Sequence, residues 1–490
     1  MRATRAMWCL CHFSHLLAPF NVNENKILVY DIAFIFINLD IHVKLVIHLV
    51  KILKKSGWSR TMKRKIEKYL LWWKNLRAER MPLLLYGARQ IGKTYALREF
   101  GANHFKHTIY LNFEADPALA HLFDDSINPE KILPKIKRYF DVPLAPEDAL
   151  LIFDEIQNCE RALTSLKYFC EEAPEYHVIG AGSLLGVRTT SKSFSFPVGK
   201  VITKLMYPLN FEEFLWESDK AVFTDEIEKC FTTHTPMESA VHNSLLDLYR
   251  EYLLVGGMPL AVYNYFKDDT VLSYREIQRI ILDTHTSDMT KYADKTQSIK
   301  TIMTYGSIVP QLARDKRKFQ YKQVAKGARA SSYSESIDWL TGAGVVLKCT
   351  KFTDGSMPPS LTADSSSFKL YMGDVGLCSY KAGLTRENAR LFDQTFMGGV
   401  TENYIANSLA CNDYDLFYWE SESNAEVDFV IKKGDRFIPV EVKAGEHTRS
   451  YSLNAYVKKY NPEYSIRISA KNFGFDNGII AIPLYAAYLC

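Results

Sequence analysis

The sequence lacks the cysteine pattern of a disulfide framework or a zinc site. Its nine cysteines are scattered, odd in number and include no C-x-x-C pair, so we expect free thiols in a reducing compartment, the cytoplasm. Glycine and proline are not in excess, at 24 and 18 of 490 residues, which excludes collagen-like and low-complexity chains. The net charge of +4 is too small to indicate a nucleic-acid partner by itself.

An uninterrupted membrane-spanning run is also missing. Residues 27–50 are apolar and long enough for a span, but Asp31, Asp40, His42 and Lys44 interrupt them, and a charge at mid-membrane is costly. No small-residue cleavage site of a secretory signal follows. Three interpretations of residues 1–61 stay open, in this order: a spurious or disordered extension translated upstream of a true start at Met62, a poorly packed surface segment, and a membrane anchor. We expect no stable membrane insertion.

The strongest motif begins after a short apolar stretch at residues 83–86. The next eight residues read GARQIGKT and are followed by helical spacing; strand, G-x-x-x-x-G-K-S/T and helix is the arrangement of a phosphate-binding P-loop. Its glycines let successive N–H groups point inward, and the helix N-terminus adds its positive end. The residues expected to bind nucleotide are Gly87, Ala88, Arg89, Gln90, Ile91, Gly92, Lys93 and Thr94.

A pair of acids follows the P-loop in the order that nucleotide hydrolysis requires. About sixty residues after Lys93, an apolar run at 149–153 ends in Asp154 and Glu155, which is the Walker B pattern. We expect Thr94 and Asp154 to hold Mg²⁺, Lys93 to reach the β- and γ-phosphates, and Glu155 to polarise the attacking water. A surface acidic pair at a strand end is the alternative. ATP and Mg²⁺ are the expected cofactors.

Strands alternate with helical patterns on either side of these acids. Residues 108–113 and 176–183 read as further strands, and 117–140 as helical. The alternation predicts an α/β fold with a parallel sheet covered on both faces and a site at the strand carboxyl ends. Ser183, at the end of its strand, is a candidate sensor of the γ-phosphate, with a plain turn residue as the alternative. Farther on, Asn210 is expected to begin a helix.

The middle of the chain changes to helical spacing and then to a mixed pattern. Residues 245–292 are mainly helical, consistent with a small lid. Residues 318–352 follow a winged-helix outline of a helix, a break at Gly327, a second helix and a strand. The basic residues in this region are Lys316, Arg317, Lys318, Lys322, Lys326 and Arg329. Contact with nucleic-acid phosphates and a packing or protein-contact role stay equally open. Residues 353–367 read as a polar loop.

The last hundred residues contain a second chemical candidate. Glu402 has helical spacing, Asp428 begins a strand, and Glu441 and Lys443 lie on the next strand after a turn at 434–435. This is the layout of the PD-(D/E)xK nuclease fold. Asp428 and Glu441 can share a divalent metal, Glu402 can complete its shell, and Lys443 can stabilise charge at phosphorus. An exposed hairpin with alternating acids is the alternative.

Several motifs together resemble the AAA-14 family of bacterial and archaeal ATPases. They are the GARQIGKT loop, LLIFDEIQ, GAGSLLG and the FPVGK to YPLNFEEFL run, with GGMP at 256–259, DMTKY at 288–292, FKLYMGDVGL at 368–377 and EVDF at 426–429. The resemblance covers residues 62–490. It implies a P-loop ATPase of the AAA+ type, followed by the family's usual domain of unknown function. It also implies a homo-oligomer with an arginine finger, for which Arg188 is a candidate; Arg89 is expected to contact a neighbouring acid or a phosphate.

The expected organisation follows from these motifs. The expected segments are an N-terminal extension at 1–61, an AAA+ type P-loop ATPase domain at 62–220, a helical lid or linker at 221–300, a winged-helix-like domain at 301–365 and a restriction-endonuclease-like domain at 366–490. The leading hypothesis is a cytoplasmic Mg²⁺-dependent ATPase that couples hydrolysis to a partner or nucleic-acid transaction. An ATP-dependent metal nuclease acting on DNA and a non-catalytic nucleotide-gated binding switch are the alternatives.

Overall fold

The computed structural model describes residues 62–77, 80–183, 197–267, 270–291, 295–355, 358–388, 394–421, 425–445 and 451–490. The chain divides into two units, residues 1–62 with 268–271, and residues 63–267 with 272–490. The predicted extension at 1–61, its membrane alternative and Arg188 lie outside the described residues. Within the described ranges, no helix is both long and apolar enough to cross a bilayer.

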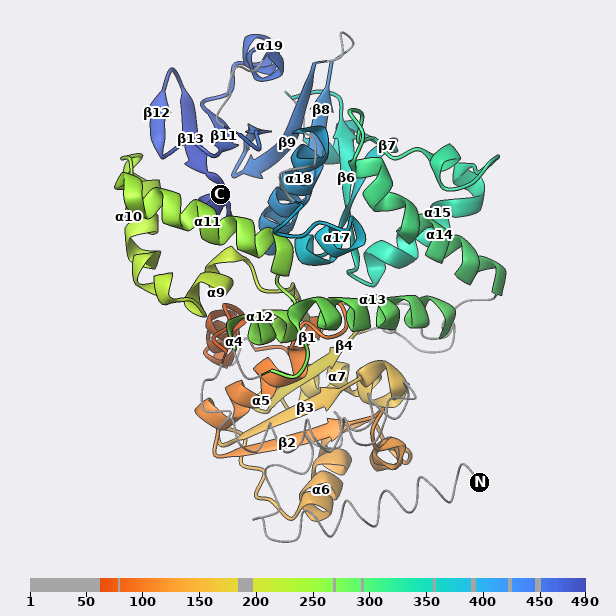
Figure 1. Cartoon of the computed structure of the whole chain (residues 1–490). Helices are drawn as coiled ribbons and strands as arrows, with labels where there is room; N and C mark the ends of the chain where they lie inside the picture. The colour runs from red at the N-terminus through yellow and green to blue at the C-terminus, as the bar shows by residue number, and fades with distance from the viewer. Residues whose placement is uncertain are drawn as a thin grey trace. The chain divides into compact units, whose positions relative to one another are not determined.

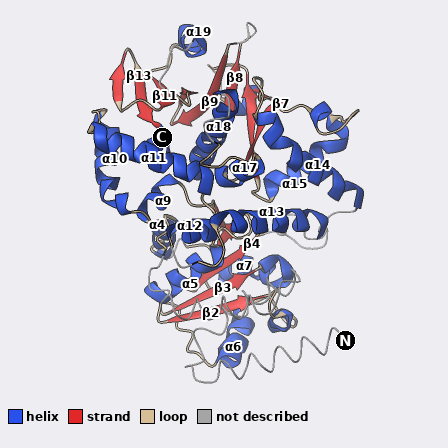
Figure 2. Ribbon diagram, viewed as in Figure 1, coloured by secondary structure: helices blue, strands red, loops and turns tan. Residues whose placement is uncertain are grey.

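The first half of the larger unit is built on a parallel sheet, which has five strands among the described residues (Figures 1 and 2). They are β1 (Leu83–Tyr86), β2 (His107–Asn112), β3 (Ala149–Asp154), β4 (His177–Gly182) and β5 (Ile202–Leu205), in the order β2-β3-β4-β1-β5. β1, β3 and β4 are buried along their whole length, as in parallel sheets covered on both faces. The predicted strands near these positions are confirmed, with ends shifted by at most one residue.

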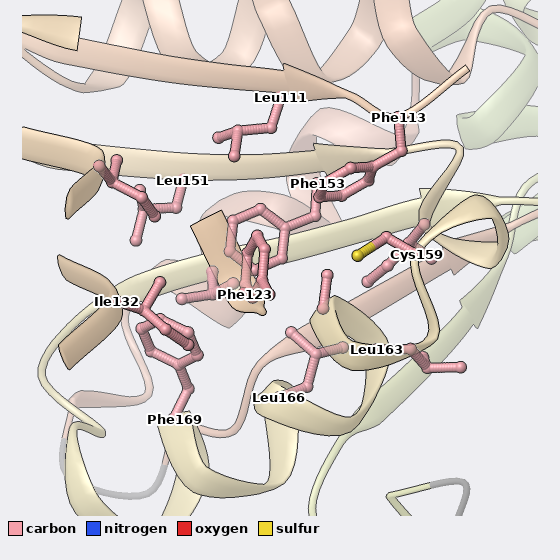
Figure 3. Close-up of a cluster of buried hydrophobic side chains, with 14 of the residues drawn as sticks. Leu111, Phe113, Phe123, Ile132, Leu151, Phe153, Cys159, Leu163, Leu166 and Phe169 are labelled. Carbon is pink, nitrogen blue, oxygen red and sulfur yellow. The ribbon is translucent and has the colours of Figure 1, made fainter. Parts of the chain in front are cut away.

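Helices and short 3₁₀ turns accompany this sheet. They are α4 (Ile66–Lys74), α5 (Lys93–His104), η2 (Pro117–Phe123), α6 (Pro129–Phe140), η3 (Ile156–Asn158), α7 (Glu160–Glu172) and α9 (Phe211–Trp216). One cluster of side chains fills the space between β2, β3 and their covering helices; it includes Leu111, Phe123, Phe153, Leu166 and Phe169 (Figure 3). Each large apolar side chain buried there contributes roughly 1.5–3 kcal/mol, so β3 and the acids at its end are held firmly.

Asn210 begins α9 as the sequence predicts. Its side-chain oxygen accepts a 3.0 Å hydrogen bond from the Glu213 N–H, and the Glu213 carboxylate accepts one of 3.0 Å from the Asn210 N–H. This reciprocal capping box satisfies two amide groups that the first helical turn would leave unpaired. It also fixes the position of the Glu213 carboxylate, which forms an ion pair with Arg64.

A helical segment follows and confirms the predicted pattern at 245–292. Its members are η4 (Asp219–Phe223), α10 (Thr224–Thr233), α11 (Ser239–Val255), α12 (Pro259–Phe266), α13 (Tyr274–Lys291) and α14 (Lys295–Leu312). Between α11 and α12 the chain passes very close to residue 209: a Cβ on Gly257 would lie 1.9 Å from the Leu209 oxygen. Only glycine fits there. The predicted boundaries at 220 and 300 fall inside η4 and α14.

The rest of the unit is organised around a mixed sheet, which has eight strands among the described residues. They are β6 (Val346–Phe352), β7 (Ala363–Met372), β8 (Phe417–Glu420), β9 (Glu426–Lys433), β10 (Arg436–Val442), β11 (Ser465–Ser469), β12 (Gly474–Asp476) and β13 (Ile479–Pro483), in the order β12-β13-β11-β10-β9-β8-β6-β7. The accompanying helices are η5 (Tyr321–Gln323), α15 (Ala330–Gly342), α16 (Pro359–Thr362), α17 (Val375–Lys381), α18 (Gln394–Cys411), α19 (Tyr451–Tyr460) and η6 (Leu484–Leu489).

The predicted winged-helix module is not a separate body in this structure. Its second helix (α15) and strand (β6) are present, but its first helix is reduced to η5. β6 pairs antiparallel with β7 on one edge and parallel with β8 on the other, so the hairpin is part of the larger sheet. The predicted boundary at 365–366 therefore falls inside β7. The first half of β7 reads ADSSS, and a polar run of this kind gives no apolar alternation by which a strand can be recognised.

Candidate functional site

The P-loop between β1 and α5 depends on its two glycines. A Cβ on Gly87 would lie 2.3 Å from the backbone oxygen of Met206, because β5 and the residue after it pass directly beside the loop. Gly92 adopts a left-handed φ of +86° at the N-cap of α5, a conformation that costs glycine least. The two glycines thus stand where the loop needs close approach and unusual backbone angles.

Lys93 lies inside the loop and is only 7% exposed. Its Nζ donates hydrogen bonds of 2.9 Å to the Gly87 oxygen and 2.8 Å to the Ala88 oxygen. Burial lowers the pKa of Lys93, while the charges of Glu155 and Asp154 act in the opposite direction. Two neutral backbone carbonyls, which other hydrogen-bond acceptors can replace, therefore hold the ammonium group inside the loop.

The side chains predicted to hold Mg²⁺ are in direct contact. Thr94 Oγ1 donates a 2.7 Å hydrogen bond to Asp154 Oδ2, and Asp154 is 1% exposed. The Tyr110 hydroxyl donates a second hydrogen bond of 2.6 Å to the same oxygen. A hydroxyl beside a carboxylate is the hard oxygen donor set that Mg²⁺ prefers, so the residues present fit this ion. Tyr110 was not predicted, because its position depends on the register between β2 and β3.

Glu155 follows β3 in a left-handed conformation with a φ of +49°. Its carboxylate accepts a hydrogen bond from Gln157 Nε2. Burial, and then the neighbouring Asp154, raise the pKa of Glu155, while Lys93 opposes the shift. A carboxyl group with a raised pKa beside the phosphate-binding loop has the properties of a general base. Gln157, which orients it, was not singled out by the sequence.

Ser183 directly follows β4, which lies between β3 and β1 in the sheet. The carboxyl ends of parallel strands meet at one edge, so Ser183 lies at the same edge as the P-loop and the Walker B acids. This is the place at which the sequence argument put a γ-phosphate sensor. The sensing role itself stays a prediction.

Arg64 is the main residue of this region that the sequence did not reveal. Its guanidinium Nε lies 3.0 Å from Glu213 Oε1, its NH1 donates a 2.8 Å hydrogen bond to the Ile91 oxygen, and its NH2 donates one of 2.9 Å to the Tyr207 oxygen. Arg64 thus connects the P-loop with the capping box of α9. A single arginine before a helix carries no pattern from which this role can be inferred.

Arg89 reaches out of the loop towards the helical segment. Its Nε lies 3.2 Å from Asp288 Oδ2, near the end of α13, and its NH2 lies 3.9 Å from Glu114 Oε1. The prediction that Arg89 contacts a neighbouring acid is confirmed. Lys291, on the same helix as Asp288, lies 3.6 Å from Glu114, so opposite charges alternate through this group.

Asp374 joins the helical segment to the larger sheet. Its Oδ2 accepts a 2.6 Å hydrogen bond from the Gly257 N–H, and its Oδ1 accepts one of 2.9 Å from the Leu377 N–H at the start of α17. Burial raises the pKa of Asp374 to about 6, although these backbone hydrogen bonds oppose the shift. A buried carboxylate shared between two backbone segments makes this a structural joint.

The C-terminal candidate residues are also brought together. Asp428 Oδ2 accepts a 2.8 Å hydrogen bond from the Val442 N–H on the adjacent strand β10, and burial, then Glu402 and Glu441, raise its pKa. Lys443 Nζ lies 2.6 Å from Glu441 Oε1. The second oxygen of Glu441, Oε2, is buried and has no hydrogen-bond partner within the described part of the chain.

Glu402 lies beside Asp428, and its carboxylate also has partners that the sequence did not reveal. Arg317 and Lys369 both form ion pairs with its carboxylate, and the Tyr371 hydroxyl donates a 3.0 Å hydrogen bond to it. Its oxygens therefore neutralise buried cations. Across the described ranges, no group of three or more acidic, histidine or cysteine side chains is arranged to hold a metal ion. The part of Glu402 in a metal shell stays a prediction.

Arg317 belongs to the basic run for which nucleic-acid contact and a packing role were both open. Its side chain is 16% exposed and turns inward to Glu402, which agrees with a packing role for this residue. The fully buried Lys369 on β7 pairs with both Glu402 and Glu426. Lysine within an apolar strand gives no sign of such pairing, because the acids come from α18 and β9, more than thirty residues later in the chain.

Comparison with protein families supports the division of the chain. A model described as an AAA domain, AAA_14, matches residues 79–215. Two models described as domains of unknown function, DUF8612 and DUF4143, match residues 246–388 and 397–487. The first match agrees with the family resemblance found in the motifs and, with the parallel sheet, supports an ATP-binding P-loop fold for this region. The third agrees with the expected C-terminal domain of unknown function.

Comparison with individual proteins gives more distant similarities. The uncharacterized protein MJ1544 of Methanocaldococcus jannaschii is 24% identical over 392 residues, which are 76% of this chain and 78% of that protein. A Walker-type ATPase of Pyrococcus abyssi is 12% identical, with 66% of this chain and 96% of that chain covered and a TM-score of 0.38. The ORC1 protein of Aeropyrum pernix, solved in complex with DNA, is 11% identical, with coverages of 68% and 96% and a TM-score of 0.26. Both TM-scores are too low to indicate more than a distant likeness.

Proposed function

We propose that this chain is an Mg²⁺-dependent ATPase of the AAA type that binds ATP at residues 87–94. The observation that carries the proposal is the 2.7 Å hydrogen bond between Thr94 Oγ1 and Asp154 Oδ2. These atoms come from two motifs about sixty residues apart and form a partly buried oxygen pair beside the P-loop lysine. A chance acidic pair at a strand end would be solvated, whereas Asp154 is 1% exposed.

The residues of the loop bind and orient the phosphates in this proposal. Lys93 exchanges the Gly87 and Ala88 carbonyls for oxygens of the β- and γ-phosphates. Mg²⁺, held by Thr94 and Asp154, supplies positive charge that neutralises the phosphate oxygens. The cost of moving Lys93 is small, because its present hydrogen bonds are replaced by stronger charge-assisted ones.

Glu155, Gln157 and Ser183 act on the attacking water and the γ-phosphate in this proposal. Glu155 accepts the proton of the attacking water, and its raised pKa makes it a stronger base than a free carboxylate. Gln157 orients this carboxylate through its side-chain amide. Ser183 contacts the γ-phosphate from β4. Hydrolysis then proceeds by positioning and charge stabilisation, as in other phosphoryl transfers.

Binding of fluorescent mant-ATP to the full chain, with and without Mg²⁺, tests this proposal. The protein is expected to bind mant-ATP more tightly with Mg²⁺, and Lys93→Ala to lose most of that binding. Lys106→Ala is a matched control, because Lys106 pairs with Asp148 at the opposite end of the sheet strands. Equal binding by the parent protein and Lys93→Ala would contradict the assignment of the loop.

The cellular setting follows from the same proposal. We place the protein in the cytoplasm, as a homo-oligomer in which a neighbouring subunit supplies an arginine to the γ-phosphate. Its partner is a protein or DNA; the exposed cations near α15 favour DNA, and these are Lys316, Lys322, Lys326 and Arg329. Persistent ATPase activity without any partner would contradict a purely nucleotide-gated switch.

A second candidate function is an ATP-dependent nuclease in the C-terminal domain. It is favoured by the buried Glu441 Oε2 that lacks a hydrogen-bond partner in the described residues, between Asp428 and Lys443. Glu402, which also pairs with two cations, remains the third candidate acid of this site. Cleavage of DNA or RNA by the parent protein with Mg²⁺ or Mn²⁺, lost in Asp428→Ala, is the expected result; no cleavage by either protein would leave this domain with a binding or structural role.

A further inference from the structure

Arg89 lies where a positive charge would act on the nucleotide. It stands between the two P-loop glycines, directly after Ala88, whose oxygen accepts a 2.8 Å hydrogen bond from Lys93 Nζ. Lys93 is the residue expected at the β- and γ-phosphates. The Arg89 side chain therefore leaves the loop beside the place where the Lys93 ammonium group is held.

Asp288 holds this arginine from outside the loop. Its Oδ2 lies 3.2 Å from Arg89 Nε, and its side chain is 17% exposed. Burial raises the pKa of Asp288, while Arg89 and Lys291 act in the opposite direction. The carboxylate therefore has a reason to stay paired: a partly buried acid without a cation would carry the full cost of its desolvation.

The helix that carries Asp288 is firmly anchored. Ile277, Ile281 and Met289 on α13 are buried. Gln278 Nε2 donates hydrogen bonds of 2.7 Å to the Leu254 oxygen and 3.0 Å to the Val255 oxygen at the end of α11. Asp288 is thus presented to the P-loop from a fixed element, which is what precise placement of a second side chain requires.

Glu114 completes the arrangement from a third element. It follows β2 and lies 3.9 Å from Arg89 NH2 and 3.6 Å from Lys291 Nζ. Two acids and two bases alternate across the end of the loop. Because a guanidinium group is planar, contacts at Nε and NH2 together fix the direction in which its plane points.

We propose that Asp288 is a positioning residue for ATP: through Arg89, it directs the guanidinium group to the γ-phosphate, so that α13 contributes to the recognition of ATP over ADP. This inference rests on the proposed ATPase function. Asp288 also offsets the charge of Arg89, so that two cations, Arg89 and Lys93, can stay close together before the phosphates arrive. ADP lacks the phosphate that Arg89 addresses and depends on Asp288 much less.

The test compares Asp288→Asn with the parent protein in the binding of mant-ATP and mant-ADP, each with Mg²⁺. The affinity for mant-ATP is expected to fall about tenfold, because a hydrogen bond to a charged group is lost, and that for mant-ADP to change by less than about twofold. Asp283→Asn is the matched control, since Asp283 is an exposed acid on the same helix; it is expected to leave both affinities unchanged.

A second background shows whether Asp288 acts through Arg89. In Arg89→Ala, the further change Asp288→Asn is expected to have no effect on mant-ATP binding. An additional loss in this double variant would overturn the inference, and so would equal losses for ATP and ADP, no loss, or tighter ATP binding in Asp288→Asn. Asp288→Glu keeps the charge and is expected to retain most of the ATP preference, which separates positioning from a folding defect.

The proposed ATPase function and the role of Asp288 can be overturned separately. If the parent protein binds neither nucleotide, the proposed function is wrong and this inference falls with it. If the parent protein binds both nucleotides and Asp288→Asn behaves in the same way, only the role of Asp288 is overturned.

Discussion

The hydroxyl of Thr94 donates a 2.7 Å hydrogen bond to Asp154 Oδ2. Thr94 lies in the first turn of α5, and Asp154 is the last residue of β3. The contact depends on the strand order, in which β1, the strand before the P-loop, and β3 lie on either side of β4. Tyr110 adds a second donor to the same oxygen. These two hydrogen bonds orient the Asp154 carboxylate. Removing the carboxylate should therefore weaken the binding of Mg²⁺ more than the binding of nucleotide.

Asp154→Asn is expected to raise the Mg²⁺ concentration needed for half-maximal ATPase activity by at least about tenfold. The amide replaces an anionic oxygen donor with a weaker neutral one. A Mg²⁺ titration at saturating ATP measures the change. Asp148→Asn, on the residue just before the same strand, serves as control, because Asp148 pairs with Lys106 away from the site. An unchanged Mg²⁺ requirement in Asp154→Asn would remove this residue from the ion site.

Arg64→Ala is expected to destabilise the protein strongly, by roughly 3–5 kcal/mol, because it leaves the Glu213 carboxylate buried without its cation. Both side chains of this pair are 6% exposed. Lys65→Ala, which breaks the adjacent and more exposed pair with Glu212, is expected to cost less than about 1 kcal/mol. Urea unfolding of the two variants makes the comparison; similar midpoints would show that Arg64 is not a structural centre.

His285 is expected to make the fold sensitive to acid. Burial lowers the pKa of His285 to about 4, whereas an unfolded histidine titrates near 6.5. Between these values the unfolded chain binds a proton that the folded chain does not, so stability falls as the pH falls from about 6.5 to 4, by about 3 kcal/mol in total. This contribution is fully present above pH 6.5 and is lost towards pH 4.

Replacing the ring in His285→Phe removes the titration and should flatten the dependence of the unfolding midpoint on pH in this window. His121→Phe is the control variant. The His121 side chain is 78% exposed, so this substitution should leave the dependence of the unfolding midpoint on pH unchanged. Two parallel profiles for the parent protein and His285→Phe would be incompatible with a buried neutral imidazole.

Lys369→Met tests the ion pairs of the C-terminal domain. The lysine is fully buried against Glu402 and Glu426. Its loss leaves Glu426 without its cation and Glu402 with Arg317 alone, at an expected cost of roughly 3–5 kcal/mol. Combining it with Glu426→Gln should restore part of that stability, since the carboxylate left without a cation is removed. Thermal unfolding measures both. Additive losses in the double variant would mean that the two residues act independently.

The sequence was most informative where one local pattern decides the structure. The apolar runs before Gly87 and Asp154 could be read as buried strands, and Asn210 with Glu213 as a helix start, because each depends on neighbours in the chain. The partners of these residues could not be found in this way. Tyr110 reaches Asp154 only through the register of β2 with β3, and Asp288 reaches Arg89 from a helix about two hundred residues later.

The C-terminal residues show the same limit. The spacing of Asp428, Glu441 and Lys443 on two strands of a hairpin could be read from alternation, and the structure places them together. The cations that pair with Glu402 could not be anticipated, since Arg317 looked like one more charge in a basic run and Lys369 stood as a single lysine in an apolar stretch. Long-range packing, not local preference, turned both side chains inward.

Phosphate release by Glu155→Gln tests the central claim most directly. The variant should bind mant-ATP with Mg²⁺ as the parent protein does, because neither the loop nor the ion ligands change. Its rate of phosphate release should fall by about 10²–10⁴-fold, the usual contribution of a general base. A parent protein that hydrolyses ATP and a Glu155→Gln variant that hydrolyses it at the same rate would contradict the account.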